Sequence, residues 1–245
     1  MPKITQTPVT IFLTPKCKIT DSTVKIGEIQ AGFNMKGFDL AGKTGTRNRS
    51  YCTEGLNACT CGIFLGKLMN MFHENSSIYA DAEGSKNKIF DAISKKVTNM
   101  ANNTKDKVQA FLFGGWGYEN VHNSNEIEKS HNLFNNIALC IEDVLPEKEK
   151  LEIPLTTIWG KINSSTPDLV YCRDNTIVLE NDIFKSLFKR KNSILNKENL
   201  IKFLQEHYEE VQIPDNIELI AKEQYIPSSS IINTLKQRKN INLTV

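Results

Sequence analysis

The sequence lacks a long apolar run, a strong excess of one charge and a signal-like start. No stretch approaches the roughly 18 to 20 consecutive apolar residues that a membrane-spanning helix needs. The first five residues, MPKIT, have neither the basic region nor the apolar run of a secretory signal peptide. We therefore expect no membrane partner and a protein made without a Sec signal, either cytoplasmic or exported by a dedicated secretion machine.

The balance of charges excludes a default role in nucleic-acid binding. Lys and Arg number 30 and Asp and Glu 28, which leaves a net charge of only +2, far from the basic surface that phosphate backbones require. Hydrophobic residues make up 40% and charged residues 24% of the 245 residues, as in ordinary globular domains. The composition therefore predicts a folded chain of one domain, with room for a smaller appendage.

Six cysteines are present, but they include no C-x-x-C pair. A chain of this length without a signal peptide does not need disulfide bridges. We therefore expect buried small side chains and, for one or two of these cysteines, chemistry.

Apolar patterns along the chain predict a mixed α/β (α+β) fold. The expected strands are 9–13, 24–29, 59–65, 68–72, 108–113, 155–159, 169–172, 176–179 and 217–221. The expected helices are 89–100, one around 127–141 capped by Asn125 and ended before Pro146, and charged segments around 183–188, 200–208 and after Ser228. Residues 31–50 hold four glycines and predict a long irregular excursion. We divide the chain into a domain at 1–180 and a mostly helical appendage at 181–245.

A phosphate-binding-loop pattern, G-x-x-x-x-G-K-T, spans Gly37–Thr44. That loop works when a buried strand leads into it and a helix leaves it, because the helix N-terminus then faces the phosphates. The residues before Gly37 are not a strand pattern, and residues 45–50 make a poor first helical turn. We interpret the match as coincidental and keep nucleotide binding through Lys43 only as an alternative.

A second candidate site pairs Cys59 with His73, which lies fourteen residues later in the sequence. If the hairpin of 59–65 and 68–72 turns around Gly66, these two residues lie directly opposite each other; a turn centred between Gly66 and Lys67 pairs Thr60 with His73 instead. A thiol within reach of an imidazole gains thiolate character, which suits attack on a carbonyl or carboxamide carbon. The alternative from the residues alone is a buried cysteine and an incidental histidine.

Two further interpretations of the same residue types stay open. Cys59, Cys61 and His73, with Cys52, are the residues of a conceivable zinc site, but C-x-C spacing without a second cysteine pair is a weak signal. Among the other histidines, His122 follows a glycine-rich strand end and is a pocket candidate. His131 and His207 fall on expected helices and are interpreted as surface or hydrogen-bonded residues.

The segment 53–59, TEGLNAC, resembles the T-x-G-L-G-S-C segment of the CheD family of chemoreceptor glutamine deamidases. The resemblance covers roughly residues 24–180 and also draws on Ile26-Gly27-Glu28, the strand with His73, Phe113-Gly114-Gly115, the helix at 132–141, Ile153-Pro154-Leu155 and Gly160. Cytotoxic necrotizing factor toxins are similar in fold and in their Cys-His pair. The resemblance implies a layered β-sandwich with flanking helices.

The resemblance also implies a protein glutamine deamidase without metal or cofactor. Cys59 is then the nucleophile, His73 the acid-base and Thr53 the residue that orients the imidazole, with backbone N–H groups near Cys59 for the oxyanion. The implied partner is a protein that carries a reactive glutamine, and an amine in place of water makes the same site a transglutaminase.

The departures from the CheD pattern favour a bacterial toxin or effector delivered to a host cell. Asn57-Ala58 stands where the family has Gly-Ser, and the glycine-rich segment and residues 181–245 are additional. The alternatives are a non-catalytic protein-binding module on the same scaffold, and a cysteine protease or other thiol hydrolase.

Overall fold

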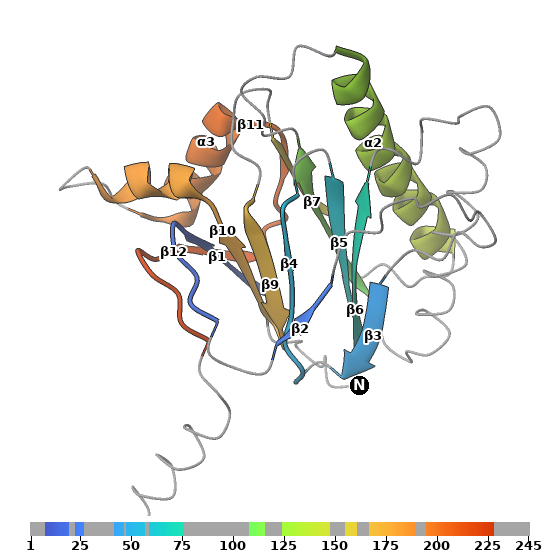
Figure 1. Ribbon diagram of the computed structural model, residues 1–245, viewed down its shortest axis with the longest axis horizontal. Coiled ribbons are helices and arrows are strands. Elements are labelled where there is room, and N and C mark those ends of the chain that lie inside the picture. Colours follow the sequence, from blue (N-terminus) through green and yellow to red (C-terminus); the bar gives the residue numbers. More distant parts are fainter. Residues whose placement is uncertain are drawn as a thin grey trace, which may run out of the picture.

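Two six-stranded mixed β-sheets lie face to face at the centre of the molecule (Figure 1). This computed structural model describes residues 8–19, 23–26, 42–46, 48–56, 59–75, 108–115, 124–147, 155–160, 167–189 and 195–227. The first sheet has the order β12 (Glu218–Ala221), β1 (Thr10–Thr14), β10 (Thr176–Glu180), β9 (Leu169–Arg173), β4 (Tyr51–Glu54), β2 (Val24–Lys25). The second has the order β11 (Tyr208–Gln212), β8 (Thr156–Gly160), β7 (Gln109–Gly115), β5 (Cys59–Leu65), β6 (Leu68–Asn75), β3 (Gly42–Thr46). The expected mixed α/β class is confirmed.

The main core lies between the sheets, and a second apolar layer lies under helix α2 (Ser124–Glu147). Alternate residues of β5, such as Cys61 and Ile63, face the first sheet, whereas Phe64 faces α2. Helix α2 covers the outer face of the second sheet (Figure 1) with Leu133, Phe134, Ile137 and Ile141. Strands β5 and β7 are therefore buried on both faces, which explains their continuous apolar runs.

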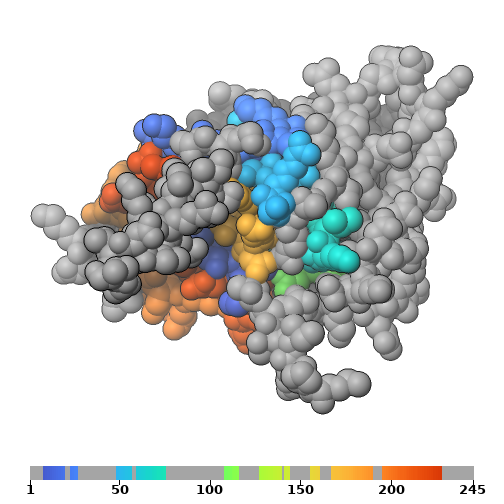
Figure 2. Space-filling model, turned by 90° about the horizontal axis from the view of Figure 1, so that it is seen from below, coloured from blue at the N-terminus to red at the C-terminus, as the bar shows by residue number. Residues whose placement is uncertain are grey.

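The predicted hairpin of β5 and β6 exists, but both expected registers are wrong. Leu65 pairs with Met69, so the turn is centred on Lys67, and the Gly66 N–H donates to the Leu68 carbonyl at 3.0 Å. His73 consequently lies opposite Cys61. This turn reaches the surface on the same face of the molecule as the β9–β10 turn (Figure 2). The opposite end of the hairpin carries Cys59.

The expected irregular excursion at 31–50 is wrong for residues 42–46. They form strand β3, which pairs antiparallel with β6, from Gly42 opposite Phe72 to Thr46 opposite Leu68. The last three residues of the phosphate-loop pattern, Gly42 to Thr44, therefore belong to a strand where that loop requires a helix. Residues 27–41 lie outside the described ranges.

The chain after residue 180 is part of both sheets. Following the 3-10 helix η2 (Asp182–Phe188) and helix α3 (Lys197–His207), strand β11 pairs with β8 and β12 pairs with β1. Leu200 and Leu204 of α3 are buried in the core between the sheets. The described part of the segment expected to be a mostly helical appendage thus supplies an edge strand to each sheet.

Helix α2 begins and ends one or two residues away from the expected signals. It starts at Ser124, so Asn125 lies in its first turn and does not precede it, and Pro146 lies in its last turn and not beyond its end. The helices expected at 89–100 and after Ser228 fall outside the described residues. Within the described ranges, none of the helices has the length and apolar content that crossing a membrane requires.

Candidate active site

The three predicted site residues lie at one end of the sandwich, on strands of both sheets. Thr53 is the third residue of β4 in the first sheet, whereas Cys59 begins β5 and His73 lies on β6 in the second. Gly55, which follows β4, has a φ of 70° and donates its N–H to the Asp168 carbonyl at 3.0 Å. A side chain in this left-handed conformation costs about 1 to 2 kcal/mol, so glycine favours the change of direction at Gly55, just after β4.

A hydrogen bond between the sheets joins Thr53 to His73. The Thr53 Oγ1 lies 2.6 Å from the His73 Nδ1 and 2.8 Å from the Ile26 carbonyl oxygen. A carbonyl only accepts, so the single hydroxyl proton goes to Ile26, and the Thr53 oxygen then accepts from Nδ1–H. This arrangement assigns the proton of a neutral ring to Nδ1 and leaves the lone pair on Nε2, the form a general base needs.

Cys59 and His73 share the inner face of the second sheet, as diagonal neighbours. Cys59 pairs directly with Asn75, and Cys61 pairs with His73. Directly opposed residues on antiparallel strands have Cβ atoms about 4.5 to 5.5 Å apart, and diagonal ones roughly 7 Å apart, which an aromatic ring still spans. The strand register therefore places the His73 imidazole within reach of the Cys59 thiol. The two residues are farther apart than a directly opposed pair would be.

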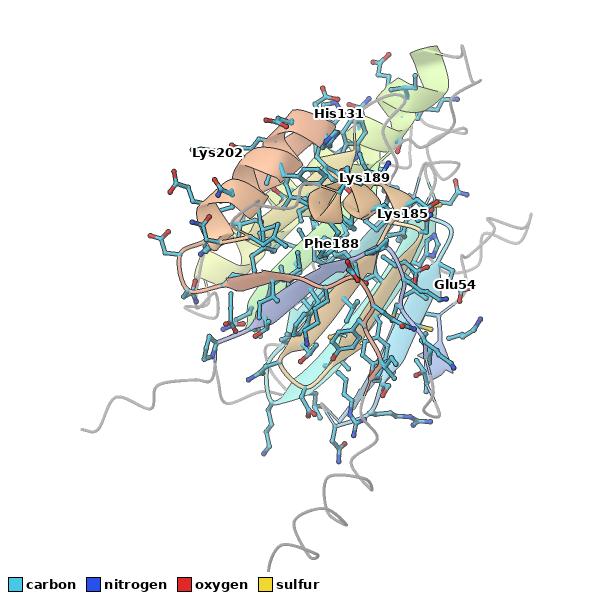
Figure 3. The ribbon with its side chains drawn as sticks, turned by 90° about the vertical axis from the view of Figure 1, so that its left-hand side faces the viewer. Glu54, His131, Lys185, Phe188, Lys189 and Lys202 are labelled. Carbon is cyan, nitrogen blue, oxygen red and sulfur yellow. The ribbon has the colours of Figure 1, made fainter. Side chains whose placement is uncertain are left out.

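All three side chains are withdrawn from solvent. Thr53, Cys59 and His73 are each 1% exposed. Burial lowers the local dielectric constant and so strengthens hydrogen bonds among these groups. Among the described residues on these strands, Glu54, at the end of β4 (Figure 3), is exposed, and Asn75, at the end of β6, is partly exposed.

Cys61 is a core residue, although it lies directly opposite His73. It is fully buried, and burial, reinforced by the nearby Cys172, raises the pKa of its thiol well above the usual value. At neutral pH it is therefore protonated and a poor nucleophile. Cys172 in turn contacts the Met69 sulfur at 3.0 Å.

Cys52 does not join Cys59, Cys61 and His73 in a zinc site. Cys52 belongs to the cluster on the outer face of the first sheet, with Tyr171 and Val178, whereas its neighbour Thr53 faces inward. In the ranges that the structure describes, no three His, Cys, Asp or Glu residues are grouped as metal ligands are. No disulfide joins any two of the five cysteines that the structure describes, Cys17, Cys52, Cys59, Cys61 and Cys172.

Two of the other histidines, His131 and His207, lie on described helices and contact residues outside this site. His131 of α2 bonds Glu210 through Nε2 at 2.6 Å and stacks on Trp159, with ring centroids 4.6 Å apart. His207, the last residue of α3, packs against Phe203. Both fall on helices and have partners, as predicted. His122 lies outside the described residues.

Two residues beside Cys59 were missed by sequence reasoning. Asn75 was missed because the register was wrong. Gly114 of β7 was noted only within a family pattern, yet a Cβ there would lie 2.6 Å from the Cys59 carbonyl oxygen. The absence of a side chain at Gly114 therefore lets β7 approach the start of β5 closely.

No protein-family model and no curated protein matches this chain. The interpretation of the site therefore depends on its own residues and geometry.

Proposed function

We propose that this chain is a thiol-dependent protein glutamine deamidase with a CheD-like sandwich, a bacterial toxin or effector whose substrate is a host protein. The observation that carries the proposal is the buried hydrogen bond from His73 Nδ1 to Thr53, on the same strand face as Cys59. This bond joins a base to an orienting group, and the strand register sets them on the face that carries a candidate nucleophile, which is the logic of a catalytic triad.

The reaction proceeds through a thioester. The Cys59 sulfur attacks the carboxamide carbon while His73 Nε2 takes the thiol proton. His73 then returns that proton to the nitrogen as the C–N bond breaks and ammonia leaves. Water, deprotonated by His73, attacks the thioester and releases a glutamate carboxylate and the free thiol. An amine in place of water gives transglutamination, and neither route needs a metal or cofactor.

Selective alkylation of Cys59 tests the proposal without knowledge of the substrate. With limiting iodoacetamide at neutral pH, we expect label to concentrate on Cys59 and to slow about ten- to thirtyfold in His73→Ala, because an unassisted thiol is only a few per cent ionised. Peptide mapping by mass spectrometry measures both quantities.

Cys61 is the internal control, because it lies on the same strand face but is held protonated by burial. Even labelling of all cysteines, unchanged by His73→Ala, would reject the dyad and favour the non-catalytic binding module.

Thr53→Val is expected to lower the alkylation rate of Cys59, because valine keeps the shape of threonine but removes the acceptor for His73 Nδ1–H. Loss of an orienting partner typically costs about ten- to a hundredfold in activity. Thr53→Ser retains the hydroxyl and is expected to restore most of the rate. Equal rates in the valine and serine variants would show that Thr53 only fills space.

A further inference from the structure

The backbone N–H of Cys59 is already used within the protein. It donates to the Leu56 carbonyl at 2.9 Å. In many hydrolases the N–H at or beside the nucleophile stabilises the oxyanion of the tetrahedral intermediate. Because this N–H is already engaged, a side-chain donor beside Cys59 is the next candidate.

Asn75 lies where such a donor is needed. It is the residue directly opposite Cys59 and shares its face of the sheet, so their Cβ atoms are about 4.5 to 5.5 Å apart. Its side-chain amide carries two N–H donors. His73 lies two residues earlier on the same face of β6. Strand β6 thus presents an amide donor directly opposite Cys59 and the base one step farther along the same face.

Exposure distinguishes Asn75 from its neighbours. Cys59 and His73 are each 1% exposed, whereas Asn75 is partly exposed at the last residue of β6. A carboxamide that approaches Cys59 past the end of β6 therefore passes this side chain.

We propose that Asn75 is the oxyanion donor of the site. When the Cys59 sulfur bonds to the carboxamide carbon, the carbonyl π electrons move to oxygen, and Asn75 Nδ2–H donates to that oxygen. The electrons return as the C–N bond breaks and ammonia leaves with the proton from His73. This inference rests on the proposed deamidase function and adds a catalytic residue to it.

Two small reagents distinguish oxyanion stabilisation by Asn75 from a general loss of Cys59 reactivity. Iodoacetamide alkylates sulfur by displacement at a saturated carbon and forms no oxyanion, whereas p-nitrophenyl acetate acylates it through a tetrahedral oxyanion. In Asn75→Ala we expect acylation of Cys59 to slow about a hundredfold while alkylation stays within about a factor of two, since one oxyanion donor typically contributes about 10² to 10³ in rate.

Two further variants make the test specific. Asn75→Asp preserves size but replaces the amide donor with an ionised acceptor, so acylation is expected to be at least as slow as in Asn75→Ala. Asn136→Ala is the matched control, because Asn136 lies on α2 and donates to the Asn132 carbonyl, away from the inner face. We expect it to leave both rates unchanged.

The outcomes separate this inference from the proposed function. Unchanged acylation in Asn75→Ala and Asn75→Asp, or equal slowing of acylation and alkylation, overturns the role of Asn75. Unselective labelling of Cys59 in the unmodified protein overturns the deamidase proposal itself. Selective labelling together with slowed acylation alone supports both.

Discussion

Replacing Cys59 by serine is expected to lower turnover at least about a thousandfold, because removal of a nucleophile leaves only the contribution of binding and the oxyanion site. A serine hydroxyl stays protonated beside an imidazole that activates a thiol, so His73 cannot rescue it. The substitution changes one buried atom, and the protein is expected to fold. The burst of p-nitrophenol from p-nitrophenyl acetate, compared at equal folded concentrations, measures the loss.

Cys61→Ala is the matched control for this result. Cys61 is two residues along the same strand and faces the same core, yet its buried thiol remains protonated. We expect this variant to keep the burst and to lose only stability. Full turnover in Cys59→Ser, or loss of the burst in Cys61→Ala, would contradict the assignment of the nucleophile.

The hairpin was predictable from sequence, but its register was not. Two apolar runs with Gly66 and Lys67 between them indicate β5 and β6. Register is normally set by alternation of polar and apolar residues. Strand β5 is buried along its full length because α2 covers its other face, so its sequence carries no such alternation. The turn centred on Lys67 decides the register, and with it Asn75 becomes the partner of Cys59.

The edge strands were harder to predict than the central ones. Gly42–Thr46 contains no apolar side chain larger than the threonine methyl, and it becomes a strand by backbone pairing with β6. Tyr208–Gln212 is mostly polar and joins the sheet beside β8, with a bulge after Tyr208. Central strands have apolar faces that sequence reveals, whereas edge strands depend on an available neighbour.

The candidate site also depends partly on local sequence and partly on tertiary packing. The spacing of Thr53, Gly55 and Cys59 is local, and the glycine turn between the sheets follows from it. The bond from Thr53 to His73 requires both sheets to be packed, and Ile26 must supply the carbonyl that fixes the hydroxyl proton. The sequence therefore indicated which residues belong to the candidate site. The position of the proton on His73 follows only from the packing of the two sheets.

Gly62→Ala is expected to destabilise the protein by about 2 to 3 kcal/mol, because a Cβ at this position would overlap the ring of Phe72. Phe72 lies directly opposite Gly62, is 0% exposed to solvent, and packs against Phe64 in the apolar layer under α2. The ring therefore has no free direction in which to move. Chemical denaturation measures the loss, which corresponds to about 5 to 10 °C in Tm.

A double-mutant cycle distinguishes this steric cause from the intrinsic effect of replacing a glycine in a strand. In a Phe72→Leu background the ring that meets the new Cβ is absent, and Gly62→Ala is expected to cost less than about 1 kcal/mol. The two sites are in contact, so non-additivity is the expected signature. An equal cost in both backgrounds would mean that the ring of Phe72 does not require a glycine beneath it.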